Sequence, residues 1–330
     1  MGPELSRENL VNAVLALALL AAPLIAVALD EPFYVTLASR VAILALAGVG
    51  LNLALGTGGM VSFGHAAFFG LGGYVAGVAA LHGFEGSHFI AWPLEIGGSE
   101  HMLVIWAVAL VVTAVVALGI GAVSLRTSGV YFIMITLAFA QMIYYFAISL
   151  PTYGGEDGLS IYLRSGLPGI EAEDPLTFFL VCYALLLGVI YLLHRLVDSR
   201  FGAALQCARM NPERLATLGI APFPVKLTAF TLSAMITGLA GALFAELNGF
   251  VSPAMLSWQL SGEIIIFVIL GGVGRLFGPL AGAALFILLE SFIGGLTDRW
   301  QLVLGLVLLS VVLFARGGVI GLLAGKARHD

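Results

Sequence analysis

Long apolar runs alternate with short polar or glycine-rich segments along the whole chain. A helix that crosses the hydrocarbon core of a bilayer needs about 20 apolar residues, and fewer if it is short or half-buried. The third, eighth and ninth runs are short or rich in glycine, so each could be a broken or re-entrant helix. The runs predict ten helices, over residues 10–29, 33–55, 62–82, 102–125, 129–149, 175–197, 224–245, 257–270, 279–293 and 300–316.

The composition agrees with this pattern. Only 10% of the residues are charged, 60% are hydrophobic, and the mean hydropathy is +1.07. Soluble domains carry about 25% charged residues, so most of this surface must face lipid. We therefore predict an all-α polytopic integral membrane protein with the lipid bilayer as its surroundings, in which residues 1–330 form a single transmembrane domain. A disordered chain, a disulfide scaffold and a nucleic-acid binder are excluded on the same grounds.

The distribution of Lys and Arg predicts the orientation. Cytoplasmic loops of membrane proteins are enriched in these residues. With the N-terminus in the cytoplasm, only Arg164 and Arg299 fall outside, and Arg40 lies within a span. Both termini are then cytoplasmic. The inner side receives Arg7, Arg126, Arg195, Arg200, Arg209, Arg214, Lys226, Arg275, Arg316, Lys326 and Arg328.

The first span could also be a secretory signal, because Ala26-Val27-Ala28 resembles a cleavage site. Its apolar run of about 20 residues exceeds the length of a signal h-region, which favours a retained helix.

The longest hydrophilic stretch on the predicted cytoplasmic side covers residues 195–226. Asn211 suits an N-cap, Pro212 the first turn, and Glu213 the positive end of the helix dipole. Gly219 then ends a helix of about two turns. The alternative is a solvated loop with one helical turn.

Apolar residues on this short helix are expected to be exposed, and such a surface favours a partner groove. They are Leu215, Ala216, Leu218 and Ile220.

Glycine is unusually dense between residues 50 and 78. Gly56, Gly58 and Gly59 predict a break in the backbone at membrane depth, which must be enclosed by protein or line a wet cavity. The polar side chains there either satisfy the freed backbone groups or line a substrate path. They are Asn52, Ser62 and His65.

Residues 261–283 contain a second glycine-rich segment, which predicts a tight cytoplasmic turn between two short helices. Three ionisable residues, Arg40, Glu263 and Glu290, fall within predicted spans, each near an outer interface. Glu263 could line an outer vestibule and meet a polar or ammonium-bearing solute, or it could brace a neighbouring helix end.

Several motifs follow one another in a fixed order along the chain. They are Gly50-Leu51-Asn52-Leu53, Gly56, Gly59, Ser62, Gly64, His65, Phe68, Gly70, Tyr74, Ala208-Arg209, Asn211, Glu213, Gly219-Ile220, Lys226-Leu227, Ala229-Phe230, Ser233-Ala234, Gly238–Leu243, Leu270–Gly274, Gly278-Pro279, Gly282-Ala283 and Trp300-Gln301. In these motifs the chain resembles the permease subunits of branched-chain amino acid ABC importers, of the LivM type. The resemblance covers most of the chain from about residue 40 onward. Family members often have an acidic or amide pair in place of Asn211-Pro212, and a small residue in place of Arg275.

The resemblance implies the ABC importer permease fold in a bacterial inner membrane, with transport by alternating access and no enzymatic chemistry in this chain. It implies a LivH-like second permease, two LivG- and LivF-like ATPases that carry ATP and Mg, and a periplasmic solute-binding protein. Residues 209–220 would be the coupling helix, with Arg209, Asn211, Pro212, Glu213, Arg214, Leu215, Leu218 and Gly219 at the ATPase groove. The missing phosphate-loop motif agrees with ATP hydrolysis on separate subunits.

Other functions stay open at this point. Permeases of the same family also carry urea, amides or aromatic acids. A secondary transporter driven by an ion gradient would need more ionisable residues deep in the bundle than this chain has. A membrane-embedded metalloenzyme is disfavoured, because no two histidines share metal-ligand spacing on one helix.

Overall fold

The computed structural model describes residues 7–86, 88–90, 96–98, 101–161, 164–166, 174–296, 299–314 and 317–324. Seven helices in this part of the chain are long and apolar enough to cross a membrane. They are α1 (Arg7–Ala28), α2 (Pro32–Asn52), α3 (His65–Glu85), α4 (Met102–Ser124), α5 (Val130–Ile148), α6 (Pro175–Val197) and α9 (Pro222–Asn248).

Three shorter apolar helices complete the predicted set: α10 (Trp258–Gly271), α11 (Gly278–Gly294) and α12 (Trp300–Phe314). The all-α polytopic prediction is therefore confirmed. The break, however, lies at the end of α2, which continues as the π-helix η1 (Leu53–Thr57), whereas the third span is the uninterrupted helix α3.

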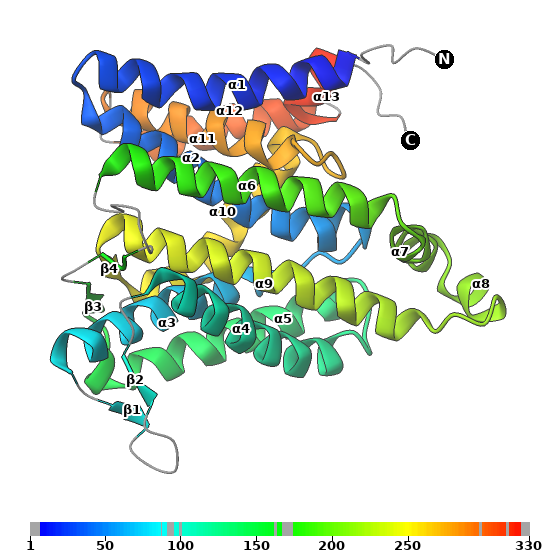
Figure 1. The fold of residues 1–330 in the computed structure, drawn as a ribbon. Helices are drawn as coiled ribbons and strands as arrows, with labels where there is room; N and C mark the ends of the chain where they lie inside the picture. Colours follow the sequence, from blue (N-terminus) through cyan, green and yellow to red (C-terminus); the bar gives the residue numbers. More distant parts are fainter. Residues whose placement is uncertain are drawn as a thin grey trace.

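The smaller elements gather at the two ends of the bundle (Figure 1). Helices α7 (Arg200–Met210) and α8 (Pro212–Thr217) project at one end, where α1 begins and α13 (Gly318–Ala324) lies. The opposite end carries the strands β1 (His88–Ile90), β2 (Ile96–Gly97), β3 (Leu159–Ser160) and β4 (Phe250–Val251), which pair as β1–β2 and β3–β4. Short 3-10 turns η2 (Pro151–Tyr153) and η3 (Pro253–Leu256) precede β3 and follow β4.

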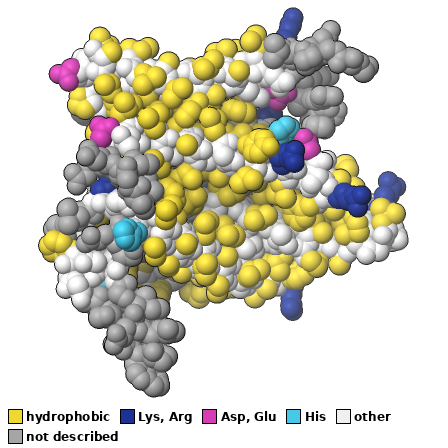
Figure 2. Space-filling model, viewed as in Figure 1, with side chains coloured by type: hydrophobic (Ala, Val, Ile, Leu, Met, Phe, Trp, Pro, Cys, Tyr) yellow, Lys and Arg dark blue, Asp and Glu magenta, His cyan; other side chains and the backbone are white. Residues whose placement is uncertain are grey.

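The charges are distributed unequally between these ends. Figure 2 shows an apolar band around the middle and most of the visible Lys and Arg side chains at the end that carries α7 and α8. The beginning of α1 lies at this same end, as the charge bias predicts. Arg316, Lys326 and Arg328, which contributed to that bias, lie outside the described residues.

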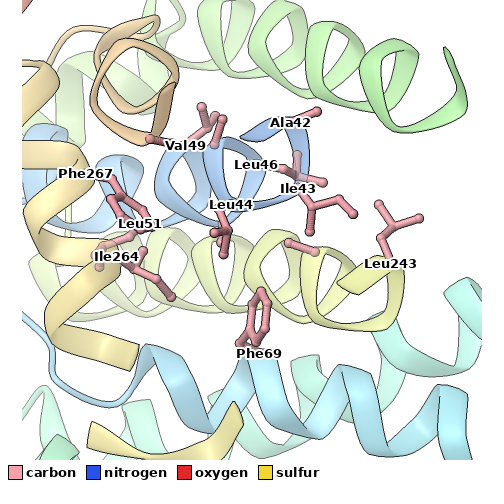
Figure 3. Packing of buried hydrophobic residues seen from close by; sticks show 14 of the residues in the cluster. Ala42, Ile43, Leu44, Leu46, Val49, Leu51, Phe69, Leu243, Ile264 and Phe267 are labelled. Atoms are coloured by element: carbon pink, nitrogen blue, oxygen red, sulfur yellow. The ribbon is translucent and has the colours of Figure 1, made fainter. Parts of the chain in front are cut away.

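Helices α2 and α9 form the centre of the bundle. Residues Ala42, Ile43 and Leu46 of α2 are fully buried, and Leu243 of α9 and Phe69 of α3 lie beside this helix (Figure 3). Helix α1 instead exposes aliphatic side chains such as Leu17. A helix that is apolar on all sides is expected in a bundle core or against lipid, and these helices show both cases.

The contact between α3 and α9 depends on glycine. A Cβ on Gly72 would overlap the backbone carbonyl of Gly238, and one on Gly241 would overlap the carbonyl of Phe69. Small residues at helix contacts let backbones approach closely in membranes, where packing rather than water exclusion holds helices together.

We expect Gly72→Val to lower the free energy of unfolding by about 1–3 kcal/mol or more, which is the usual effect of overpacking a core. The overlap is with backbone, so the helices must move apart. The measurement is the thermal unfolding midpoint in detergent. Gly119→Ala on α4 is the control, because nothing lies within 4 Å of its Cβ position. Equal midpoints for the two variants would contradict the close contact.

Candidate functional site

The backbone break between α2 and α3 is the most irregular part of the bundle. The π-helix η1 ends at Thr57, and Gly59 adopts a φ of +68°, which favours glycine. The amides of Gly58 and Met60 turn back to the carbonyls of Leu53 (3.1 Å) and Ala54 (2.9 Å). Single π-helical turns occur frequently at functional sites, so this segment is a candidate for conformational change.

Asn52 joins this break to the turn between α10 and α11. Its side chain is 4% exposed. Its Nδ2 donates to the carbonyl of Arg275 at 2.8 Å, and its Oδ1 accepts from the amide of Gly274 at 2.9 Å. A Cβ on Gly56 would lie 2.6 Å from the same Gly274 nitrogen. The two glycine-rich segments therefore touch directly, and the two hydrogen bonds of Asn52 hold them together.

His65 joins three helices from a fully buried position. Its Nε2 lies 2.8 Å from Ser233 Oγ on α9, and Ser233 Oγ donates to the carbonyl of Gly50 on α2 at 2.6 Å. Because the Ser233 hydroxyl gives its proton to Gly50, it accepts one from His65 Nε2–H. The ring also meets Phe68 and Phe230 edge-on, at 5.8 Å between centroids in each case.

Ser62 is also fully buried, and its Oγ accepts from the amide of Gly64 at 3.1 Å, just before α3 begins. The hydroxyl of Ser261 on α10 accepts from the amide of Ala66 at 2.8 Å. Asn52, Ser62 and His65 thus each have a hydrogen-bond partner in the protein. This geometry supports the interpretation that they brace the backbone around the break and the neighbouring helices, while contact with a solute stays a prediction.

Three ionisable residues predicted within spans converge from different helices. Arg40 of α2 forms an ion pair with Glu290 of α11, at 3.1 Å between Nη2 and Oε2. Glu263 of α10 is half-buried and lies near enough for the charges of both to act on it, although the ion pair joins only Arg40 and Glu290. If all three are charged, the cluster carries one guanidinium and two carboxylates. Charged side chains in spans face the bundle interior or a wet cavity, so this cluster is a candidate for meeting a polar solute.

The predicted short helix exists as α8. Pro212 begins it, Asn211 Oδ1 accepts from the Arg214 amide at 2.9 Å, and Gly219 follows its end with a φ of +84°. Helix α7, which lies directly before it, was not predicted. Asn211, Pro212, Glu213, Arg214, Leu218 and Gly219 are all exposed.

One expectation for this helix is wrong. Leu215 was expected on the exposed apolar surface, but it is only 2% exposed within this chain. In a six-residue helix beside α9, one side must face the bundle, and Leu215 occupies that side. Ala216 is exposed as expected, and the large apolar residues exposed here are Leu218 (70%), Ile220 (42%) and, from α7, Met210 (77%).

The sequence pattern did not indicate a structural role for Glu246, which lies near the end of α9. Its side chain is 1% exposed, and its Oε2 accepts from the Ser165 amide at 3.1 Å. Arg164 donates to the Glu246 carbonyl at 3.3 Å and covers the Phe178 ring at 4.5 Å. The only signal was a lone acid at the end of an apolar run. These contacts hold the segment after β3 against α9 and α6.

The described part of the chain contains no group of three or more His, Cys, Asp or Glu side chains arranged to hold a metal ion.

Residues 33–313 match the sequence model of a family described as the permease component of branched-chain amino acid transport systems. The chain is 28% identical over 327 residues to a protein of Salmonella typhimurium, the high-affinity branched-chain amino acid transport system permease protein LivM. The match covers 90% of this chain and 73% of the relative. The Escherichia coli protein of the same name is similar to the same extent.

A third relative is the autoinducer 2 import system permease protein LsrC of Yersinia enterocolitica. It is 27% identical over 184 residues, which cover 50% of this chain and 51% of the relative. No solved structure matches this chain significantly.

We expect Asn52→Ala to destabilise the fold by about 1–3 kcal/mol, the usual cost of an unsatisfied polar group, because it leaves the Gly274 amide without its acceptor and the Arg275 carbonyl with only the Gly278 amide as donor. The measurement is the unfolding midpoint in detergent. Thr228→Ala is the control, since this exposed hydroxyl bonds only within its own helix, to Pro224. If the unfolding midpoint of Asn52→Ala equals that of the control, the hydrogen bonds of Asn52 to Gly274 and Arg275 do not stabilise the fold.

Proposed function

The chain belongs to the family of permease components of branched-chain amino acid transport systems, and we propose that it works as one of two permeases in an ATP-driven importer. The observation that carries this proposal is the family match over residues 33–313, which includes both glycine-rich segments and the short helices between α6 and α9. The chain is a multi-pass membrane permease and moves solute. ATP hydrolysis then takes place on separate ATPase subunits, which also hold the Mg.

The partners follow from this role. A second, LivH-like permease completes the membrane part. Two LivG- and LivF-like ATPases bind at the cytoplasmic face, and a solute-binding protein delivers the solute at the periplasmic face. The Lys and Arg residues near α7 and α8 favour a cytoplasmic location for that end, in the bacterial inner membrane, with both termini inside.

Helix α8 supports ATPase docking. It projects beyond the ends of the long helices (Figure 1), and the exposed Leu218 directly follows its last residue. An apolar side chain exposed at the end of a capped helix, beyond the apolar band, suits a groove on a soluble partner. Leu218, with the neighbouring Ile220 and Met210, would enter that groove, and Glu213 and Arg214 would lie at its rim.

Branched-chain amino acids are the solutes we propose, because the family description and the LivM relatives agree on them. The second candidate is a same-family permease for another solute such as urea, an amide or an aromatic acid. The similarity to LsrC supports this second candidate, because the name of LsrC refers to a different solute, autoinducer 2. An ion-gradient transporter has no comparable support.

An amino acid offers the permease both a carboxylate and an ammonium group. Arg40, Glu263 and Glu290 offer the complementary charges within one cluster. We therefore place this cluster on the path of the solute, where Glu263 meets the ammonium group.

We expect Leu218→Asp to lower recovery of the ATPases with the affinity-tagged permease by more than tenfold, because burying an unpaired charge in an apolar groove costs several kcal/mol and each 1.4 kcal/mol is about a factor of ten. The side chain is 70% exposed, so the permease itself should fold normally. Leu218→Met keeps the apolar side chain and is the control. Normal recovery of the ATPases with Leu218→Asp would show that α8 is not the docking element.

We expect Glu263→Gln to reduce uptake of leucine at least fivefold more than uptake of an uncharged amide, because glutamine keeps the size and hydrogen bonding of glutamate but loses its charge. Radiolabelled uptake by cells that express the whole transporter measures this difference. Glu156→Gln makes the same change at an exposed position and should leave uptake unchanged. An equal small loss for both solutes would mean that Glu263 only braces helices.

A further inference from the structure

Arg209 reaches back into the bundle from the last turn of α7. Its Nη1 donates to the backbone carbonyl of Gly56, in the π-helix η1. Its aliphatic stem lies against the next turn of the break, since a Cβ on Gly59 would be 2.7 Å from Arg209 Cγ. The resemblance to the importer family places Arg209 at the ATPase groove, whereas this contact points it toward the membrane helices.

The carbonyl of Gly56 depends on this arginine. The amides that follow it serve other acceptors, because Gly58, Gly59 and Met60 donate to Leu53, Leu55 and Ala54. A carbonyl released by a helix break needs a donor from elsewhere in the protein. A guanidinium hydrogen bond is charge-assisted and is stronger than a neutral one.

Both ends of this contact connect to further elements. On one side, the Asn211 amide donates to the Cys207 carbonyl at 2.9 Å, so α8 begins directly where α7 ends. On the other side, Asn52 holds the turn between α10 and α11 through Gly274 and Arg275. A continuous series of contacts therefore runs from α8 through Arg209 and η1 to α10 and α11.

We propose that Arg209 is a positioning residue that transmits movement of α7 and α8 to the hinge formed by residues 53–64. This inference rests on the proposed function, because the movement originates in the ATPases. When α8 shifts with its ATPase, Arg209 pulls on the Gly56 carbonyl, and Asn52 carries the displacement to the turn between α10 and α11. Glu263 lies on α10, so the same movement reaches the charged cluster on the proposed solute path.

The first experiment tests the contact without ATPases. Hydrogen exchange is measured on the full permease in lipid nanodiscs, for the wild type, Arg209→Ala, Arg209→Lys and Arg200→Ala. Arg200 is an exposed arginine on the same helix and serves as the matched control. We expect Arg209→Ala to accelerate exchange over residues 57–64 at least tenfold, Arg209→Lys to have a smaller effect, and Arg200→Ala to have none. Unchanged exchange in Arg209→Ala would overturn the proposal.

The second experiment measures leucine uptake and ATP hydrolysis together in proteoliposomes that contain the whole transporter. We expect Arg209→Ala to assemble normally and to hydrolyse ATP within twofold of the wild type, but to transport at least tenfold less leucine per ATP. Arg209→Lys should recover part of that ratio. A simple folding or docking defect would instead lower hydrolysis, uptake and assembly in parallel.

The outcomes separate this inference from the function on which it rests. If hydrolysis, uptake and assembly fall together in Arg209→Ala, then Arg209 docks the ATPase, and the transmission role is overturned. A wild-type ratio of leucine to ATP in that variant overturns it as well. If the wild-type transporter itself shows no ATP-driven uptake, the proposed function fails, and the transmission role fails with it.

Discussion

A helix that ends within a membrane bundle leaves backbone groups that lipid cannot satisfy, and the protein must supply their partners. Residues 53–64 impose this requirement here. Arg209 and Ser62 satisfy part of it with side-chain hydrogen bonds to Gly56 and Gly64, Asn52 joins the end of α2 to the turn between α10 and α11, and the His65–Ser233–Gly50 series fixes the helices on both sides. Apart from Ser62, these side chains contact distant parts of the chain, so together they connect the break with α2, α3, α7, α9 and the turn between α10 and α11.

This arrangement separates a rigid region from one that can move. The α3–α9 contact is backbone against backbone at Gly72 and Gly241, so these two helices pack as closely as their main chains allow. The break, in contrast, is held by single side chains, and single π-helical turns are rare and occur frequently at functional sites. A permease that opens alternately to the two sides of the membrane needs both properties, since rigid helices must rotate about a flexible junction.

The sequence was sufficient to predict the helices and the break, because apolar runs and clustered glycines are local signals. It also predicted the cap at Asn211 and the glycine, Gly219, that follows the end of α8. It could not predict α7, whose apolar content is too low for the span criterion, nor that Leu215 faces the bundle, because the inward side of a six-residue helix depends on the neighbouring α9. The pairing of Arg40 with Glu290 joins residues 250 positions apart, and no local pattern encodes such a contact. Asn52 and His65 were found as polar residues near the break, but their partners Arg275 and Ser233 were not.

In the proposed function, ATP and not an ion gradient drives solute through this permease. Leucine uptake into proteoliposomes that contain the whole transporter and its solute-binding protein, with ATP supplied on the ATPase side, distinguishes the two energy sources. We expect uptake that requires ATP and persists when ionophores collapse all proton and sodium gradients. Uptake that proceeds without ATP and follows an imposed proton or sodium gradient would contradict it.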